Sequence, residues 1–419
     1  MAAEIGILLC SLALYARYGM GALAYLLGVG ILTYGVGLLL PRRRWLMWPL
    51  IALNAAALLG ARFLPLAGWG IAAPLGLSYF TLQSISYTVD VAQGKYEPER
   101  SVLAFGLYLS YFPHLFFGPI ESYPGMKAAL AARKISWDSI SEGGARLMWG
   151  LFKKLAIAAR AGVVVGSISA APEQYRGAYA LLAMLLYAVE IYADFSGGVD
   201  IVLGVSRMLG LRLSENFDAP YFSQSVAEFW RRWHITLGAW LRTYIYIPLG
   251  GNRRGKVRKV LNGIVTFLVS GLWHGSQYLL WGLLNGIFVA CGERFKTRFR
   301  ALNCALTFLL MSLLWSFFIW PDSRTALASI ASLVTTFNYG ELAANIENLG
   351  LNAGEWLAFL CCALLLWGHD LFRAPLARRF ASAAPAARTA VIVALALAVL
   401  VLGMYGIGFE AQDFIYSRF

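Results

Sequence analysis

Long apolar stretches separated by short basic segments dominate this chain of 419 residues. Runs of about 20 apolar residues recur along nearly its full length, and each is long enough to cross a bilayer as a helix. The bilayer interior offers no water to backbone amides, so such runs must satisfy their own hydrogen bonds as helices. The pattern therefore predicts an all-α polytopic integral membrane protein, a single transmembrane domain over residues 1–419.

The basic segments indicate which side of the membrane each apolar run faces, because Lys and Arg concentrate in cytoplasmic loops. On this rule the segment 321–355, which is rich in acids, is an external loop, and the tail 409–419 is extracytoplasmic. A short run at 5–16 is a span or half-span. Full spans are predicted over 18–40, 45–66, 71–92, 153–171, 178–205, 301–320, 356–372 and 389–408.

Three further segments break this simple pattern. Segments 225–250 and 260–291 have basic residues at both ends and are therefore predicted to enter and leave on the same side. The two arms of 260–291 meet at His274, about 24 Å from either basic end if both are helical. Segment 101–126 contains three prolines and is predicted to be broken or re-entrant, with the topology of 101–134 left open.

Composition agrees with a membrane protein and excludes several other classes. Hydrophobic residues make up 59% of the chain and charged residues only 14%, against about 25% in soluble proteins. The net charge of +13 is spread over short loops, which favours contact with membrane lipids and not with nucleic acid. The five cysteines lack CxxC spacing, so neither a disulfide framework nor a metal site is predicted.

Two of the four histidines, His274 and His234, lie in Trp-rich apolar sequence. A titratable imidazole at membrane depth is a candidate functional group. Gly271 and Gly275 flank His274 and allow close approach of a ligand or backbone. A neutral imidazole there could take a proton from a hydroxyl nucleophile as a general base. The alternative is a structural histidine that bonds a backbone carbonyl.

Basic and aromatic residues around His234 suggest a site for an anionic acyl donor. Two arginines precede this histidine, and a Gly-rich basic loop follows at 248–255. Guanidinium groups bind phosphates well, although the same arginines could instead extend to lipid headgroups, and the loop lacks P-loop spacing. The candidate donor-binding residues are Trp230, Arg231, Arg232, Asn252 and Arg253.

Two acids lie four residues apart in the apolar run 178–205 and would share one helix face. These residues, Glu190 and Asp194, are candidates for structural ion pairs, with Arg231, Arg232 or Arg242 as expected partners. The alternative is a catalytic role. Isolated charges in such a segment are costly, so each must find a partner.

The chain ends in an aromatic cluster that contains Tyr416. Such a cluster could anchor the tail at the membrane interface, where Tyr and Phe are enriched. The alternative is a docked tail that brings the Tyr416 hydroxyl to the buried site.

Several motifs together resemble the membrane-bound O-acyltransferase family, in its bacterial alginate O-acetylation and D-alanyl-lipoteichoic acid transferase branch. They occur in the expected order along the chain. The matching blocks are SYFTLQSISYTVDV (78–91), FGPI (117–120), YADFSGGVDI (192–201), ENFDAPYF to GGNRRG (215–255), SGLWHG (270–275) and the terminal FIYSRF.

This resemblance implies a fold of about eleven transmembrane helices plus re-entrant segments, in a bacterial inner membrane. His274 matches the family's invariant catalytic histidine, and His234 matches its second one. The implied donor is a cytosolic thioester, either acetyl-CoA or an acyl or D-alanyl carrier protein, with no bound cofactor. Tyr416 matches an acyl-accepting position, from which an extracytoplasmic acyltransferase partner would pass the group to a polysaccharide acceptor.

The sequence thus predicts a membrane O-acyltransferase in which His274 acts as general base on the Tyr416 phenol or on another hydroxyl. Activity should be lost on acidification from about pH 8 to about pH 5.5, because the base must be neutral. A rival hypothesis is a lipid or polysaccharide translocator, which would move its substrate without covalent change.

Overall fold

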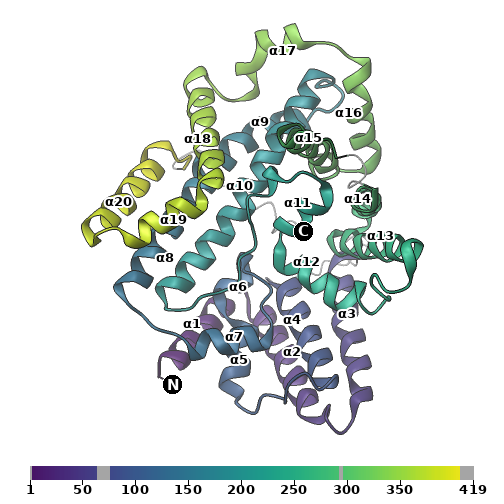
Figure 1. Cartoon of the computed structure of the whole chain (residues 1–419), viewed down its shortest axis with the longest axis vertical. Coiled ribbons are helices and arrows are strands. Elements are labelled where there is room, and N and C mark those ends of the chain that lie inside the picture. The colour runs from purple at the N-terminus through teal and green to yellow at the C-terminus, as the bar shows by residue number, and fades with distance from the viewer. Residues whose placement is uncertain (1, 64–75, 292–295, 406–419) are drawn as a thin grey trace. The chain divides into compact units, whose positions relative to one another are not determined.

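The computed structural model describes residues 2–63, 76–291 and 296–405 (Figure 1). Within these ranges the regular structure is helical, apart from one isolated antiparallel β-bridge between Phe217 and Trp233. The predicted all-α class is confirmed. The chain forms two compact units, one made of Met1–Ser139 with Val205–Ser214 and the other of Ile140–Gly204 with Glu215–Phe419.

The first unit contains the N-terminal helices. The segment 101–126 is broken, as predicted, and the hydroxyls of Ser101 and Ser122 cap the helices that follow them by accepting backbone N–H groups of Ala104 and Gly125. The helices are α1 (Ala2–Tyr18), α2 (Met20–Leu39), η1 (Arg44–Leu46), α3 (Met47–Phe63), α4 (Leu77–Ala92), α5 (Val102–Ser110), α6 (Phe112–Phe117) and α7 (Tyr123–Ala131).

The second unit carries every candidate residue that the structure describes. Helices α8 (Trp137–Phe152) and α10 (Ala178–Met208) run across the boundary between the units. The remaining elements are η3 (Lys153–Ala158), α9 (Ala159–Ser169), η4 (Pro220–Phe222), α11 (Val226–Arg232), α12 (Ile235–Leu241), η5 (Arg242–Tyr246), α13 (Gly255–His274), η6 (Ser276–Tyr278), α14 (Leu279–Cys291), α15 (Arg300–Ile319), α16 (Ser323–Thr335), α17 (Tyr339–Asn345), η8 (Ile346–Leu349), α18 (Ala353–Leu371), α19 (Arg373–Ser382) and α20 (Pro385–Leu402).

Four helices in the described residues are long and apolar enough to cross a membrane by themselves, namely α2, α10, α15 and α20. A fifth span is possible if Tyr339–Leu349 and Ala353–Leu371, which meet at a bend of 97°, count as one. The number of about eleven spans stays a prediction.

The segment 321–355, predicted to be an external loop, contains the helices α16, α17 and η8, and its side of the membrane stays a prediction. Asp322 caps α16 by accepting the backbone N–H of Thr325 at 2.9 Å. Asn352 and Glu355 form a capping box at the start of α18. Two of the acids that suggested an external loop, Asp322 and Glu355, therefore stabilise helix N-termini, where carboxylates satisfy free N–H groups.

Glycines bring α8 and α10 together closely. A Cβ added to Gly150 would lie 2.6 Å from the carbonyl oxygen of Gly197, and one added to Gly204 would lie 2.7 Å from that of Gly143. Only residues without side chains allow two helix backbones to approach in this way. This contact places the charged residues of α8 and η3 directly against those of α10.

Helices α13 and α14 form an antiparallel hairpin by the same means. A Cβ on Gly271 would lie 2.6 Å from the Tyr278 carbonyl oxygen, and one on Gly286 would lie 2.8 Å from the Cα of Ile264. The two arms predicted for 260–291 are thus confirmed, and their turn follows His274.

Candidate active site

His274 is the last residue of α13 and is 7% exposed. Gly275 follows with φ of 141°, a conformation that side chains other than glycine rarely adopt. The chain then enters η6 and α14, so a glycine turn holds the imidazole at the tip of the hairpin.

Aromatic rings from two neighbouring elements surround the His274 imidazole. Trp281 of α14 and Phe318 of α15 stand edge to face with it, at centroid distances of 5.6 and 5.5 Å. The adjacent Trp273 lies at 4.6 Å and Tyr278 at 6.0 Å. The imidazole is therefore buried among aromatic rings, an environment that would shield a proton transfer from solvent.

Trp230, a predicted donor-binding residue, belongs to the same group of aromatic rings. Its indole N–H donates to Asn285 Oδ1 at 2.9 Å, and its ring meets Trp281 edge to face at 5.5 Å. Asn285 is fully buried and also donates to the Trp281 carbonyl at 2.9 Å. Trp281 therefore connects Trp230 with His274, so these two predicted residues share one aromatic cluster.

His234 occupies a different kind of environment. It precedes α12 with φ of 45° and ψ of 55°, the left-handed region that is costly for non-glycine residues. The residue is 3% exposed. Its Nδ1 lies 3.4 Å from Asn216 Oδ1, and Phe195 stands edge to face with its ring at 4.9 Å.

The other predicted donor-binding residues are dispersed. Arg232 forms an ion pair with Glu228 at 2.8 Å. Arg231, Asn252 and Arg253 are exposed. The Tyr246 hydroxyl hydrogen-bonds to Asn252. Arg231 lies in the last turn of α11, and Arg253 lies in the segment between η5 and α13.

The two acids predicted to form structural ion pairs are both buried in α10. Asp194 pairs with Lys154 at 2.6 Å, so the observed partner comes from η3 and not from the expected arginines. Asp194 thus forms an ion pair, as expected, but with a lysine that the glycine contacts between α8 and α10 bring close to it. The partner of Glu190 stays a prediction.

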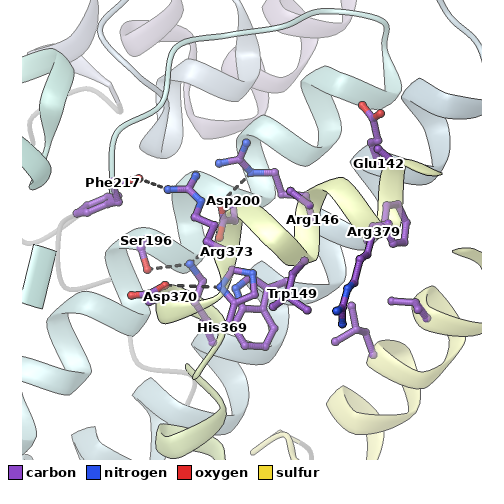
Figure 2. A pocket seen from close by; sticks show the side chains of 18 of the residues that line it. Glu142, Arg146, Trp149, Ser196, Asp200, Phe217, His369, Asp370, Arg373 and Arg379 are labelled. Atoms are coloured by element: carbon purple, nitrogen blue, oxygen red, sulfur yellow. Dashed lines mark hydrogen bonds and ion pairs between the residues drawn. The ribbon is translucent and has the colours of Figure 1, made fainter. Parts of the chain in front are cut away.

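A cavity of about 830 Å³ lies elsewhere in the second unit, among α8, α10, α18, α19, α20 and residues 215–217. One wall is charged, and Figure 2 shows Arg146, Asp200, Asp370 and Arg373 gathered there. Residues of α19 and α20, among them Leu376, Phe380, Val391 and Leu395, supply an apolar wall. Neither His274 nor His234 lines this cavity.

The charged wall is an ordered network. Lys153 pairs with Asp200 at 2.6 Å and donates to Ser196 at 2.8 Å. Arg146 bridges Asp200 at 2.8 Å and Glu215 at 2.6 Å. Burial acts to raise the pKa of the Glu215 carboxyl, but hydrogen bonds and charge from Arg146, with the charge of Arg373, outweigh it and lower the pKa.

This network was not predicted from the sequence, although two signals were present. Arg146 and Lys153 are two helical turns apart and share a face of the continuous run of α8 and η3. The acids Asp194 and Asp200 lie in the apolar run of α10, where buried carboxylates need cationic partners. Tyr416 lies outside the described residues.

The segment that contains both candidate histidines is similar to a known protein family. The model of the membrane-bound O-acyltransferase family matches residues 77–322, a segment that includes both His234 and His274. The chain belongs to the membrane-bound O-acyltransferase family. The resemblance inferred from the sequence motifs is confirmed, and the chain is a membrane protein with O-acyltransferase activity.

Relatives within the family have named activities. The chain is 35% identical to a probable alginate O-acetylase of Pseudomonas fluorescens, over 85% of this chain and 74% of that protein. It is 30% identical to a peptidoglycan O-acetyltransferase of Helicobacter pylori, over 68% of this chain and 60% of the relative. It is 25% identical to a teichoic acid D-alanyltransferase of Bacillus subtilis, over 53% of this chain and 59% of that protein.

Proposed function

We propose that this O-acyltransferase moves a short acyl group from a cytosolic thioester toward hydroxyls of a cell-envelope or exported polysaccharide. Acetyl is favoured over D-alanyl, because the chain is 35% identical to an alginate O-acetylase and 25% identical to a D-alanyltransferase. The acceptor class follows the names of these relatives.

The observation that carries the proposal is the buried His274 at the glycine turn of the α13–α14 hairpin, enclosed by aromatic rings. In the proposed step, an imidazole nitrogen takes the proton of the acceptor hydroxyl as its oxygen attacks the thioester carbonyl. The C–S bond then breaks, and the leaving thiolate is protonated by the imidazolium. An ester, a free thiol and a neutral imidazole result.

The acceptor in our proposal is the Tyr416 hydroxyl, which would carry the acyl group before an extracytoplasmic partner passes it to the polysaccharide. The imidazole must be neutral to accept the proton, so transfer should slow as the pH falls from about 8 to about 5.5. A rate that stays flat over this range would count against His274 as the base.

The decisive experiment is mass analysis of the C-terminal peptide after the purified protein is incubated with acetyl-CoA or a D-alanyl carrier protein. Wild type is compared with His274→Ala and with Gln277→Ala, a control at an exposed residue of the same turn. We expect an adduct on Tyr416 in wild type and in the control, and none in His274→Ala.

Each other outcome is informative. An adduct that persists in His274→Ala would remove the histidine from the mechanism. No adduct with either donor, together with release of free thiol in the presence of polysaccharide, would replace the tail carrier with direct transfer. If the folded protein gives no adduct and releases no thiol, the proposed function is overturned.

A further inference from the structure

Residues 215–218 connect the charged wall of the cavity with His234. In the chain these residues follow α10 and the segment 205–214, and Asn216 accepts a backbone hydrogen bond from Ile235 at the start of α12. Glu215 and Phe217 line the cavity, whereas Asn216 between them contacts His234. Contacts that hold Glu215 and Phe217 on the cavity side therefore also restrict the position of His234.

Two arginines hold the segment from the cavity side. Arg146 donates two hydrogen bonds, both 2.6 Å long, to the two carboxylate oxygens of Glu215. Arg373 donates to Glu215 Oε2 at 2.9 Å and to the Phe217 carbonyl oxygen at 2.7 Å. Figure 2 shows Arg373 reaching from α19 to Phe217. A guanidinium is suited to this task, because its rigid fork can serve two acceptors at once.

The same segment pairs with the chain around His234. The Ile235 amide donates to the Asn216 carbonyl at 3.0 Å, and the Asp218 amide donates to the Arg232 carbonyl at 3.0 Å. Asn216 Oδ1 also accepts from the Thr236 amide at 3.0 Å and from its hydroxyl at 2.7 Å. His234 lies between these bonds in its left-handed conformation.

A non-glycine residue in the left-handed region is strained and persists only where its surroundings hold it there. At His234 that constraint is the paired segment 216–218. This segment is short, and in the described residues Arg373 is the side chain that holds its Phe217 carbonyl. Loss of Arg373 would let the segment, and with it the imidazole, shift.

We propose that Arg373 is a positioning residue that acts through Glu215 and Phe217 to hold His234 in place for acyl transfer. The inference rests on the proposed function and adds to it that His234 takes part in the reaction. Arg373 touches neither donor nor acceptor in this scheme. Its loss should lower kcat about tenfold or more and leave KM for the donor nearly unchanged, because a small misplacement of a reacting group costs rate.

The test measures kcat and KM from thiol release, with whichever of acetyl-CoA and the D-alanyl carrier protein wild type uses. The variants are Arg373→Ala, Arg373→Lys and His234→Asn, and the control is Arg378→Ala on the same helix, at an exposed residue outside the cavity. Arg373→Lys should fall between wild type and Arg373→Ala, because one ammonium cannot serve both acceptors in fork geometry. It also keeps the test possible if Arg373→Ala fails to fold.

The double variant Arg373→Ala with His234→Asn decides the question. If Arg373 acts through His234, the double variant should have the kcat of His234→Asn within about twofold, because the two residues act as one unit. The positioning role would be overturned if the losses of kcat in the two single variants multiplied in the double variant. It would also be overturned if Arg373→Ala kept the wild-type kcat.

Failure of the inference can be separated from failure of the proposed function. If His274→Ala abolishes transfer and His234→Asn retains the wild-type kcat, the function stands and only the positioning role of Arg373 falls. If His274→Ala keeps full activity, the proposed function itself is wrong. Thermal unfolding in detergent, measured for each variant, identifies any that are misfolded.

Discussion

The two candidate histidines are held in opposite ways. His274 lies at the tip of a hairpin whose glycines and aromatic rings come mostly from 271–286, close to it in sequence. His234 depends on Asn216 and on Arg373, which come from distant parts of the chain. Both histidines could be found from sequence motifs. The contrast shows that the surroundings of His274 follow from nearby sequence, whereas the contacts that hold His234 depend on distant segments and could not be predicted.

The largest effect is expected at the hairpin contact. In Gly271→Val the new Cβ would lie 2.6 Å from the Tyr278 carbonyl oxygen, which is backbone and cannot move aside cheaply. We expect a loss of about 3 kcal/mol or more in the free energy of unfolding, measured by thermal unfolding in detergent. Gly263→Val on the same helix, where an added Cβ meets nothing within 4 Å, is the matched control. Equal stability of the two variants would show that the hairpin is not built on this contact.

The next effect concerns the His274 imidazole. His274→Gln keeps a polar side chain of similar size but removes the base, so kcat should fall about 100-fold to 10,000-fold. Stability should change little, because glycine and aromatic contacts hold the hairpin. The measurement pairs thiol release with thermal unfolding. A large loss of stability with normal kcat would make His274 a structural residue and remove its contrast with His234.

Much of the fold around His274 could be predicted, for reasons that the contrast explains. Apolar runs and flanking charges predicted the α13–α14 hairpin and the broken segment before α7. The turn at His274 followed from Gly275 and the symmetry of the two arms. The helices of 321–355 were not predicted, because its acids were used only to place the segment on one side of the membrane and not recognised as helix caps.

The surroundings of His234 could not be predicted by the same reasoning. Its segment, predicted to enter and leave on the same side, is divided into the short elements α11, α12 and η5, a division that the basic residues at its ends do not indicate. Nothing in a hydropathy pattern indicates that Arg373 bonds Glu215, because the ion pair depends on how α8, α10 and α19 pack. The left-handed φ of His234 also leaves no signal in a sequence that has histidine and not glycine at that position.

A smaller effect is expected from the backbone at residue 234. Asn tolerates the left-handed region, whereas a β-branched residue does not. His234→Val should therefore be about 1–2 kcal/mol less stable than His234→Asn, by thermal unfolding of both variants. Equal stabilities would mean that the loop relaxes without strain, and the need for a positioning residue would weaken.

The smallest expected effect is a pH dependence of thermal stability that comes from Glu215, in the region around His234, and not from the α13–α14 hairpin. The pKa of the Glu215 carboxyl is lowered from 4.5, so its ion pairs add stability above about pH 4.5 and lose that contribution as the pH falls further and the carboxylate is protonated. Wild type should therefore exceed Glu215→Gln in thermal stability near pH 7, and the gap should close in acid. The gap should be small, because the Glu215 side chain is 45% exposed and exposed ion pairs contribute little. Gly263→Val, in the other region, should show no such closing gap. A gap between wild type and Glu215→Gln that stayed constant with pH would mean that the hydrogen-bond geometry of Glu215, and not its charge, holds the segment beside His234.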